Sequence, residues 1–258
     1  MTVKFYKYQG TGNDFIMIDN RALGLNKERA LVEKLCNRHM GIGADGLIYL
    51  QERKGYDFEM VYFNSDGNES TMCGNGGRCL IRFAQQLGVI NQKCFFLAID
   101  GGHEGEILPD GRISLKMKDV DSIERFNNDY VLNTGSPHYV KITTDVATLP
   151  IVQAAREIRY SEKFKEEGIN VNFVEPKAGE IFVRTYERGV EDETLSCGTG
   201  VVASALVFAG AQEGEVGRVR VNAIGGNLEV KFKRNGAGFT DIYLIGPALK
   251  VFEGTIEI

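Results

Sequence analysis

Histidine and cysteine are both scarce in this sequence, with three and five of them among 258 residues. The cysteines, Cys36, Cys73, Cys79, Cys94 and Cys197, are odd in number and irregular in spacing, so free thiols are expected and not a disulfide framework. Cys73 and Cys79 stand 79 − 73 = 6 residues apart, which is wider than the short spacings of zinc motifs. We therefore expect no metal site.

Tryptophan, long apolar runs and an excess of basic residues are missing as well. No segment reaches the roughly 18 apolar residues of a membrane helix, and the first ten residues, MTVKFYKYQG, lack the apolar core of a signal peptide. The 30 Lys and Arg stand against 35 Asp and Glu, a net charge of −5, whereas nucleic-acid surfaces need basic stripes. These absences argue against membrane and nucleic-acid partners and favour a cytoplasmic protein.

Glycine is abundant, with 31 residues, and two glycine motifs reveal an internal repeat. Cys73-Gly74-Asn75-Gly76 and Cys197-Gly198-Thr199-Gly200 each precede an apolar stretch, at an offset of 197 − 73 = 124 residues. Two further pairs share an offset of 123: Asn64 with Glu187, and Gly12–Phe15 with Gly135–His138. Because the offset is close to half the chain length, the sequence predicts two homologous halves.

The expected secondary structure repeats with the motifs. Alternation and β-branched or aromatic content predict strands at Val3–Tyr8, Phe15–Asp19, Gly46–Leu50, Asp57–Asn64, Tyr139–Ile142, Asn170–Glu175, Glu180–Tyr186 and Arg218–Ala223. Helices are expected at Lys27–Asn37, which is amphipathic, at Cys79–Leu87, ended by Gly88, and at Val201–Ala209. The last of these has no polar face, so it should be enclosed by strands. The final strand-like run, Ala248–Ile258, is free to return to the first half.

A Cys-Gly-x-Gly motif at a helix start has a chemical meaning beyond its shape. Glycines let the backbone approach a ligand, and the N–H groups of a helix start attract anions. The same field lowers the pKa of a thiol and raises its thiolate fraction. Two such thiols, Cys73 and Cys197, suit a two-base reaction in which one removes an α-proton and the other returns it on the opposite face.

Other interpretations of these cysteines remain open at the level of the sequence. An isolated cysteine is most often a small buried hydrophobe, which is the expectation for Cys36, Cys79 and Cys94. A nucleophilic pair of one cysteine with His138 as its base is conceivable. That pair would leave the second glycine motif unexplained, so the repeat favours the two-thiol interpretation.

Six runs spread over nearly the whole chain resemble the signature segments of one enzyme family. They are GTGNDFIMID (10–19), RHMGIGADG (38–46), FNSDGNESTMCGNGGRC (63–79), GSPHYV (135–140), NVNFVE (170–175) and RTYERGVEDETLSCGTG (184–200). In this order they are similar to the segments of diaminopimelate epimerases. The resemblance implies interconversion of LL- and meso-diaminopimelate by a homodimer, without pyridoxal phosphate or metal.

The resemblance also implies a fold and its boundaries. It implies an α+β protein of two pseudo-symmetric domains, residues 1–118 with 248–258 and residues 119–247. Each domain is expected to be a barrel-like, mostly antiparallel sheet around a central helix, with the active site in the cleft between the domains.

The family's residue roles carry over to matching positions. Cys73 and Cys197 become the acid and base thiols, with His138 and Glu187 similar to residues that tune them. The expected contacts to substrate come from both halves: Asn13, Asn64, Gly74, Asn75, Ser136, Asn170, Glu187, Arg188, Gly198 and Thr199. Of these, Glu187 takes the reacting amino group and Arg188 a carboxylate. The alternatives are turn chemistry for the asparagines and a solvated surface pair for Glu187 and Arg188.

Two positions depart from the family's pattern. Many members have Gln where this chain has Gly46, and Asn where it has Ser136. Both changes affect the contacts to the distal end of the substrate and leave the two-thiol chemistry intact. The rival functions are a two-cysteine racemase acting on proline or hydroxyproline, and a binding module with idle thiols.

Overall fold

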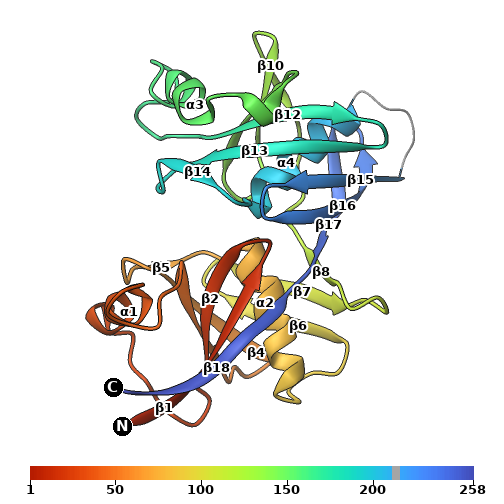
Figure 1. Cartoon of the computed structure of the whole chain (residues 1–258). Helices are drawn as coiled ribbons and strands as arrows, with labels where there is room; N and C mark the ends of the chain where they lie inside the picture. Colours follow the sequence, from red (N-terminus) through yellow and green to blue (C-terminus); the bar gives the residue numbers. More distant parts are fainter. Residues whose placement is uncertain (211–215) are drawn as a thin grey trace. The chain divides into compact units, whose positions relative to one another are not determined.

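The computed structural model describes residues 1–210 and 216–258 of the chain. These residues form two compact units, one of residues 1–115 with 246–258 and the other of residues 116–245 (Figure 1). Each unit contains one long sheet and one central helix, as the repeat in the sequence predicts.

The first unit holds most of the first half of the chain and its last strand. Its elements are β1 (Thr2–Gly10), β2 (Asn13–Asp19), α1 (Arg29–Cys36), β3 (Gly46–Gln51), β4 (Phe58–Asn64), β5 (Glu69–Ser70), α2 (Gly74–Gln86), β6 (Lys93–Ala98), β7 (Gly101–Ile107), β8 (Ile113–Lys116) and β18 (Leu249–Glu257). The strands neighbour one another in the order β18-β1-β2-β3-β4-β6-β7-β8. Pairs β2–β3 and β4–β6 are parallel and the other pairs are antiparallel.

The second unit repeats this arrangement. Its elements are β9 (Glu124–Phe126), β10 (Asp129–Asn133), β11 (Pro137–Ile142), the short 3-10 helix η1 (Val146–Thr148), α3 (Ile151–Arg159), β12 (Asn170–Lys177), β13 (Glu180–Glu187), β14 (Asp192–Thr194), α4 (Gly198–Gly210), β15 (Val216–Ala223), β16 (Gly226–Asn235) and β17 (Gly238–Gly246). The order is β9-β10-β11-β12-β13-β15-β16-β17, with β11–β12 and β13–β15 parallel. The predicted pseudo-symmetric α+β fold is therefore confirmed strand by strand.

The two central helices, α2 and α4, are largely buried. Every described residue of α4 from Gly200 to Val207 is buried, which agrees with its lack of a polar face. Helix α2 begins at Gly74, five residues before the apolar pattern from which we predicted it. A Cβ at Gly76 or Gly77 would lie 3.0 Å from a neighbouring side chain, so glycine lets this helix start lie against the sheet.

Strand β18 returns to the first unit, as the apolar run near the end of the sequence indicated. It pairs antiparallel with β1, so Thr2 lies opposite Glu257 and the two ends of the chain are adjacent (Figure 1). The amino group of Met1 donates a hydrogen bond to the carbonyl of Ile258 at 2.5 Å. Among the residues that the structure describes, no helix has the length and apolarity to cross a membrane.

Candidate active site

Cys73 and Cys197 occupy the same place at the start of the two central helices. Cys73 has extended backbone angles, and its carbonyl accepts the first helical hydrogen bond, from the N–H of Gly77 at 2.7 Å. The carbonyl of Cys197 accepts the corresponding bond from Val201 at 2.9 Å. Cys73 is half-buried and Cys197 is buried. Both thiols thus lie where helix N–H groups make no bond within the helix.

The remaining cysteines are core residues, as expected. Cys36, Cys79 and Cys94 are buried, and burial raises the pKa of each thiol to about 12. These three side chains therefore stay protonated at neutral pH.

In the first unit, Cys73 faces an amide whose orientation is fixed. The Nδ2 group of Asn13 donates to Oδ2 of Asp45 at 2.6 Å, and a carboxylate can only accept. The Oδ1 atom of Asn13 consequently faces the other way, 3.7 Å from Sγ of Cys73 and 3.4 Å from Nδ2 of Asn75. The sulfur of Cys73 therefore meets a hydrogen-bond acceptor.

Asp45 is itself held by a network of charges. Arg38 binds Asp45 at 2.6 Å and Asp14 at 2.8 Å, and buried Lys7 pairs with Asp14 at 2.8 Å. Burial by itself would raise the pKa of Asp14, but hydrogen bonds from Arg38 and Lys7 outweigh it and hold that pKa well below its usual range. The four residues of this network span positions 7 to 45, and no role was predicted for them, although Asp14, Arg38 and Asp45 stand in two of the runs that carry the resemblance.

Arg78 is a second charged residue that the sequence analysis missed. Its side chain is fully buried and donates to Oδ1 of Asn75 at 2.9 Å, to the carbonyl of Gly74 at 3.1 Å and to Thr11 at 3.4 Å. Burial lowers the pKa of Arg78 to about 10, so it remains a cation at neutral pH. The signal available in the sequence was an arginine five positions after Cys73, directly before the apolar run Cys79–Ile81.

In the second unit, Cys197 is surrounded by hydroxyl groups. Its Sγ lies 3.4 Å from Oγ1 of Thr199, which lies 3.1 Å from Oγ of Ser136. Ser136 in turn lies 2.9 Å from Nε2 of His138. The side chain of Thr134 donates to the carbonyl of Thr199 at 2.9 Å and holds the helix start against β10.

His138 is fully buried and uses both ring nitrogens. Its Nδ1 atom lies 3.1 Å from Nδ2 of Asn172, opposite the contact of Nε2 with Ser136. Burial, helped by the charge of Arg188, lowers the pKa of His138 to about 3, so the ring is neutral at physiological pH. A ring this weakly basic argues against the alternative in which His138 acts as the base for a nucleophilic cysteine.

Three other expected residues gather near this group. Asn170 donates to Ser136 at 3.2 Å and accepts from the backbone N–H of Arg188 at 2.8 Å. The guanidinium of Arg188, which is exposed, donates to the carbonyl of Glu167 at 2.9 Å. Glu187 accepts from Thr194 at 3.0 Å. Hydrogen bonds in the second unit thus connect Cys197 with Thr199, Ser136, His138, Asn170 and the backbone of Arg188, whereas Glu187 bonds to Thr194; in the first unit, Asn13 lies beside Cys73 and Asn75.

Asn64 and Gly46 lie opposite each other on β4 and β3. The backbone of Asn64 bonds within a turn to Asn68 at 3.0 Å, and its side chain is exposed. A Cβ on Gly46 would lie 2.6 Å from both the carbonyl of Phe63 and the ring of Tyr62. The ring of Tyr62 therefore occupies the space that a larger residue at position 46 would need.

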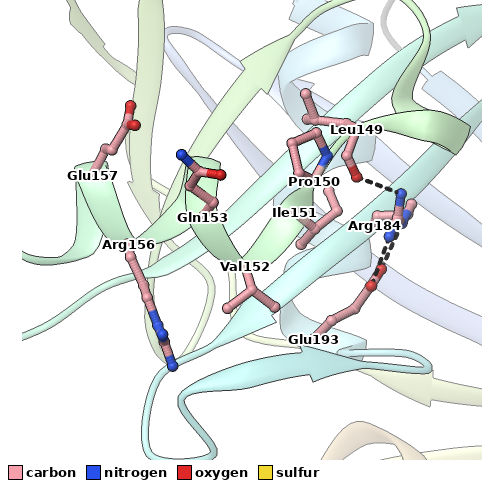
Figure 2. Close-up of a pocket in the computed structure, with 9 residues that line it drawn as sticks. All are labelled: Leu149, Pro150, Ile151, Val152, Gln153, Arg156, Glu157, Arg184 and Glu193. Atoms are coloured by element: carbon pink, nitrogen blue, oxygen red, sulfur yellow. Dashed lines mark hydrogen bonds and ion pairs between the residues drawn. The ribbon is translucent and has the colours of Figure 1, made fainter.

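An open depression of about 660 Å³ lies beside the start of α3 (Figure 2). It is lined by Leu149, Pro150, Ile151, Val152, Gln153, Arg156, Glu157, Arg184 and Glu193. Arg184 and Glu193 form an ion pair at 2.6 Å across it, and Arg184 also donates to the carbonyl of Leu149. None of the expected site residues lines this depression. Across residues 1–210 and 216–258, no group of three or more His, Cys, Asp or Glu is placed to hold a metal ion.

Comparison with solved structures supports the fold. A phenazine biosynthesis protein of the PhzF family from Bacillus anthracis superposes with a TM-score of 0.76 at 14% identity, over 100% of each chain. A hydroxyproline epimerase from Agrobacterium vitis superposes with a TM-score of 0.71 at 13% identity, over 99% of this chain and 92% of that one. At such low identity these likenesses establish the two-unit architecture alone.

Comparison of sequences is more specific. The family profile described as diaminopimelate epimerase matches residues 5–121 and 130–251. The diaminopimelate epimerase of Flavobacterium psychrophilum is 50% identical over 256 residues, which is 98% of this chain and 100% of that protein. The diaminopimelate epimerase of Aquifex aeolicus is 38% identical over 99% of this chain and 98% of that protein. With both halves matched and both cysteine motifs at equivalent helix starts, the chain belongs to the diaminopimelate epimerase family.

Proposed function

We propose that this protein is a diaminopimelate epimerase, an isomerase that interconverts LL- and meso-2,6-diaminopimelate without pyridoxal phosphate or metal. The observation that carries the proposal is the placement of Cys73 and Cys197 at equivalent starts of two enclosed helices. The 50% identity to the Flavobacterium psychrophilum enzyme supports the same substrate.

The chemistry requires one thiolate and one thiol acting on opposite faces of one α-carbon. The thiolate removes the α-proton, the carbanion forms, and the opposite thiol delivers its own proton to the other face. The turnover therefore leaves the two cysteines with exchanged protonation states. Helix-start N–H groups of Gly74, Asn75, Gly198 and Thr199 would bind the reacting carboxylate, whose negative charge grows as the carbanion forms.

The remaining polar residues would bind the two amino-acid ends of the substrate. Asn13, Asn64 and Asn170 supply amides, and Ser136 supplies a hydroxyl. Glu187 would bind the reacting amino group, and Arg188 a carboxylate, for which an exposed guanidinium is suited. His138 would act on Cys197 through its hydrogen bonds, because its neutral ring is not in direct contact with solvent.

We also propose a cytoplasmic homodimer that serves lysine and peptidoglycan precursor synthesis. Strand β18 is paired on one side by β1, and Leu249, Val251 and Phe252 on it are 54%, 57% and 45% exposed. An exposed apolar edge strand pairs readily with another chain, and an antiparallel edge can pair with itself across a two-fold axis. We therefore propose that a second copy of this chain pairs with the exposed edge of β18. Phe252→Lys should convert the dimer to a monomer, which light scattering would measure.

Solvent deuterium incorporation separates the proposed function from its rivals. In D₂O, LL-diaminopimelate should gain one deuterium at the inverted α-carbon, while L-proline and trans-4-hydroxy-L-proline should gain none. Exchange on proline with none on diaminopimelate would establish the racemase alternative. Exchange on neither substrate, with tight binding of diaminopimelate, would establish the binding module.

A further inference from the structure

A continuous line of side-chain hydrogen bonds leads from the buried strand β12 to the sulfur of Cys197. It passes through Asn172, His138, Ser136 and Thr199, with separations of 3.1, 2.9, 3.1 and 3.4 Å. All five residues belong to the second unit. The direction in which each hydrogen atom points can be worked out from the fixed end of the line.

Asn172 is the fixed end. Its side chain is fully buried, and its Nδ2 group donates to the carbonyl of Tyr139 at 2.9 Å. Because a carbonyl can only accept, the amide cannot be flipped, and its Oδ1 accepts from Thr185 at 2.9 Å. The second hydrogen of Nδ2 then points to Nδ1 of His138, which must be unprotonated. The neutral ring therefore carries its hydrogen on Nε2.

Ser136 accepts two hydrogen bonds, which leaves one direction for its own hydroxyl hydrogen. Nε2 of His138 donates to Oγ of Ser136, and so does Nδ2 of Asn170, which is oriented by the carbonyl of Pro137 at 3.0 Å. With both lone pairs engaged, the hydroxyl of Ser136 donates to Thr199. Thr199 accepts that bond and directs its own hydrogen to Sγ of Cys197.

We propose that Asn172 and Ser136 are positioning residues that present a hydrogen-bond donor to Cys197 and so hold it as the thiolate of the resting pair. A donor beside sulfur stabilises the charged form, whereas the acceptor that Asn13 presents to Cys73 stabilises the thiol. The inference rests on the proposed function for its catalytic meaning, since a two-base reaction needs one cysteine in each state.

Packing at the helix start supports this role for Asn172. A Cβ on Gly200 would lie 2.3 Å from Oδ1 of Asn172, so the side chain of Asn172 lies directly against the glycine of the Cys-Gly-Thr-Gly motif. The approach of Asn172 to α4 thus requires glycine at position 200. The relay also depends on Ser136, one of the two positions at which this chain departs from the family's pattern.

Ionisable groups reach the region around α4 from several elements. Glu187 and Arg188 come from the end of β13 and the turn that follows it, and Arg188 bears electrostatically on His138. Four pairs form on the other strands packed against α4: Asp129 with Tyr139, Glu175 with Lys177, Arg184 with Glu193, and Glu229 with Arg218. These strands also carry Lys141, Glu180, Arg220, Lys231, Lys233 and Arg234. Ser136→Ala replaces a neutral side chain by another neutral one and alters none of these charges, so its effect on Cys197 comes from the hydrogen bonds alone.

The first test is the tautomer of His138. The sequence has three histidines, so ¹⁵N-histidine labelling and NMR of the full-length protein, with a His138→Gln spectrum for assignment, resolve each ring. At pH 7 His138 should be the neutral Nε2–H form. A ring protonated at Nδ1, or a charged ring, would reverse the line of donors and overturn the proposal.

The second test is the thiolate titration of Cys197, followed by absorbance at 240 nm in Cys73→Ala protein. Burial raises the pKa of each of the other three thiols to about 12, so they should not ionise in the range of the measurement. Ser136→Ala should move the midpoint of Cys197 upward by about one pH unit, because the donor to sulfur loses its orientation. Ser204→Ala, which deletes a hydroxyl bonded only along α4 to the carbonyl of Gly200 at 2.8 Å, is the matched control.

Asn172→Asp tests the fixed end, because a carboxylate in place of the amide demands a hydrogen on Nδ1 of His138. It should switch the tautomer and raise the midpoint of Cys197 as Ser136→Ala does. If the aspartate variant does not fold, the parent tautomer and Ser136→Ala decide the matter. An unmoved midpoint in Ser136→Ala overturns the relay. Since neither measurement uses a substrate, failure of the epimerase proposal would be recognised separately, in the deuterium assay.

Discussion

Cys73 and Cys197 lie at the same place in two copies of one topology, yet their sulfur atoms face opposite hydrogen-bond partners. Cys73 meets the amide oxygen of Asn13, and Cys197 meets the hydroxyl of Thr199. The backbone of the repeat has been retained while the polar side chains have diverged. For a reaction that needs one acid and one base, this divergence is what allows two similar thiols to differ in their resting state.

The charges around the two helices differ as well. Helix α2 carries the buried guanidinium of Arg78, and the equivalent position on α4 is the buried Val202. In the first unit a cation fixes Asn75, and in the second the orientation is set by neutral amides and backbone carbonyls. The two units therefore order the side chains at equivalent helix starts by two different electrostatic means.

The largest expected effect is the loss of epimerisation when either Cys73 or Cys197 is replaced. Cys73→Ala and Cys197→Ala should each lower epimerisation by at least about 10³-fold, since one face of the α-carbon loses its acid or base. Each variant should retain exchange on the face served by the remaining thiol. Coupled measurement of stereochemical inversion and deuterium exchange checks both, and near-normal inversion in either variant would contradict a two-base mechanism.

The second largest loss of activity is expected when the buried cation of α2 is removed. Arg78→Met should lower kcat/KM about 100-fold and destabilise the fold by about 1–3 kcal/mol, because Asn75 and the carbonyl of Gly74 lose their donor. The converse change, Val202→Arg, should prevent folding, because it would bury a guanidinium charge at a fully buried position on α4. Urea unfolding measures the change in stability, and steady-state kinetics measures the change in kcat/KM. Full activity in Arg78→Met would show that the activity does not depend on this cation.

Asp45→Asn should change the surroundings of Cys73 and leave those of Cys197 unchanged. Asn13 loses the carboxylate that orients it, so its oxygen is no longer held toward Cys73. We expect kcat/KM to fall about 10-fold and the thiolate fraction of Cys73 to rise in Cys197→Ala protein. Asp19→Asn, at the opposite end of β2 from Asn13, removes a surface pair with Arg21 and is the control. An equal change in both variants would assign the effect to general destabilisation.

The smallest expected effect concerns the pH dependence of stability. His138 has a pKa of about 3 in the folded protein and an ordinary value of 6.5 when unfolded, so the unfolded chain binds the extra proton between these values. Stability should therefore fall as pH drops below about 6, by at most about 1.4 kcal/mol per pH unit from this group. Urea unfolding of the parent and of His138→Gln at pH 7 and 5 measures it. The same decrease in both proteins would exclude His138 as its source.

Regular patterns made much of the fold predictable from the sequence. Phe15–Asp19 and Asn170–Glu175 have the β-branched and aromatic content of strands, and both are strands in the structure. The start of α2 was not visible in the helical pattern, because glycines at positions 74, 76 and 77 have low helix propensity and are accepted only by close packing. Tertiary contacts, which propensity does not report, decide such positions.

Reasoning from the residues alone predicted those parts of the candidate site that belong to the repeated Cys-Gly-x-Gly motif. The helix-start positions of Cys73 and Cys197 follow from the spacing of the glycines. Asp45 and Asn172 stand within two of the runs that carry the resemblance, 38–46 and 170–175, but no role was assigned to them, because each acts through a neighbour distant in sequence. Arg78 escaped notice because arginine side chains are rarely fully buried.

The pairing of β18 with β1 also has a consequence for the order in which a nascent chain can fold. The ribosome makes β1 before β18, with the second unit between them, so the first unit lacks this strand until β18 has been made. The second unit, residues 116–245, has all its strands earlier and receives β9 just before β10. The half that begins second is thus the half that can be completed first, and one edge of β1 stays unpaired until β18 is available.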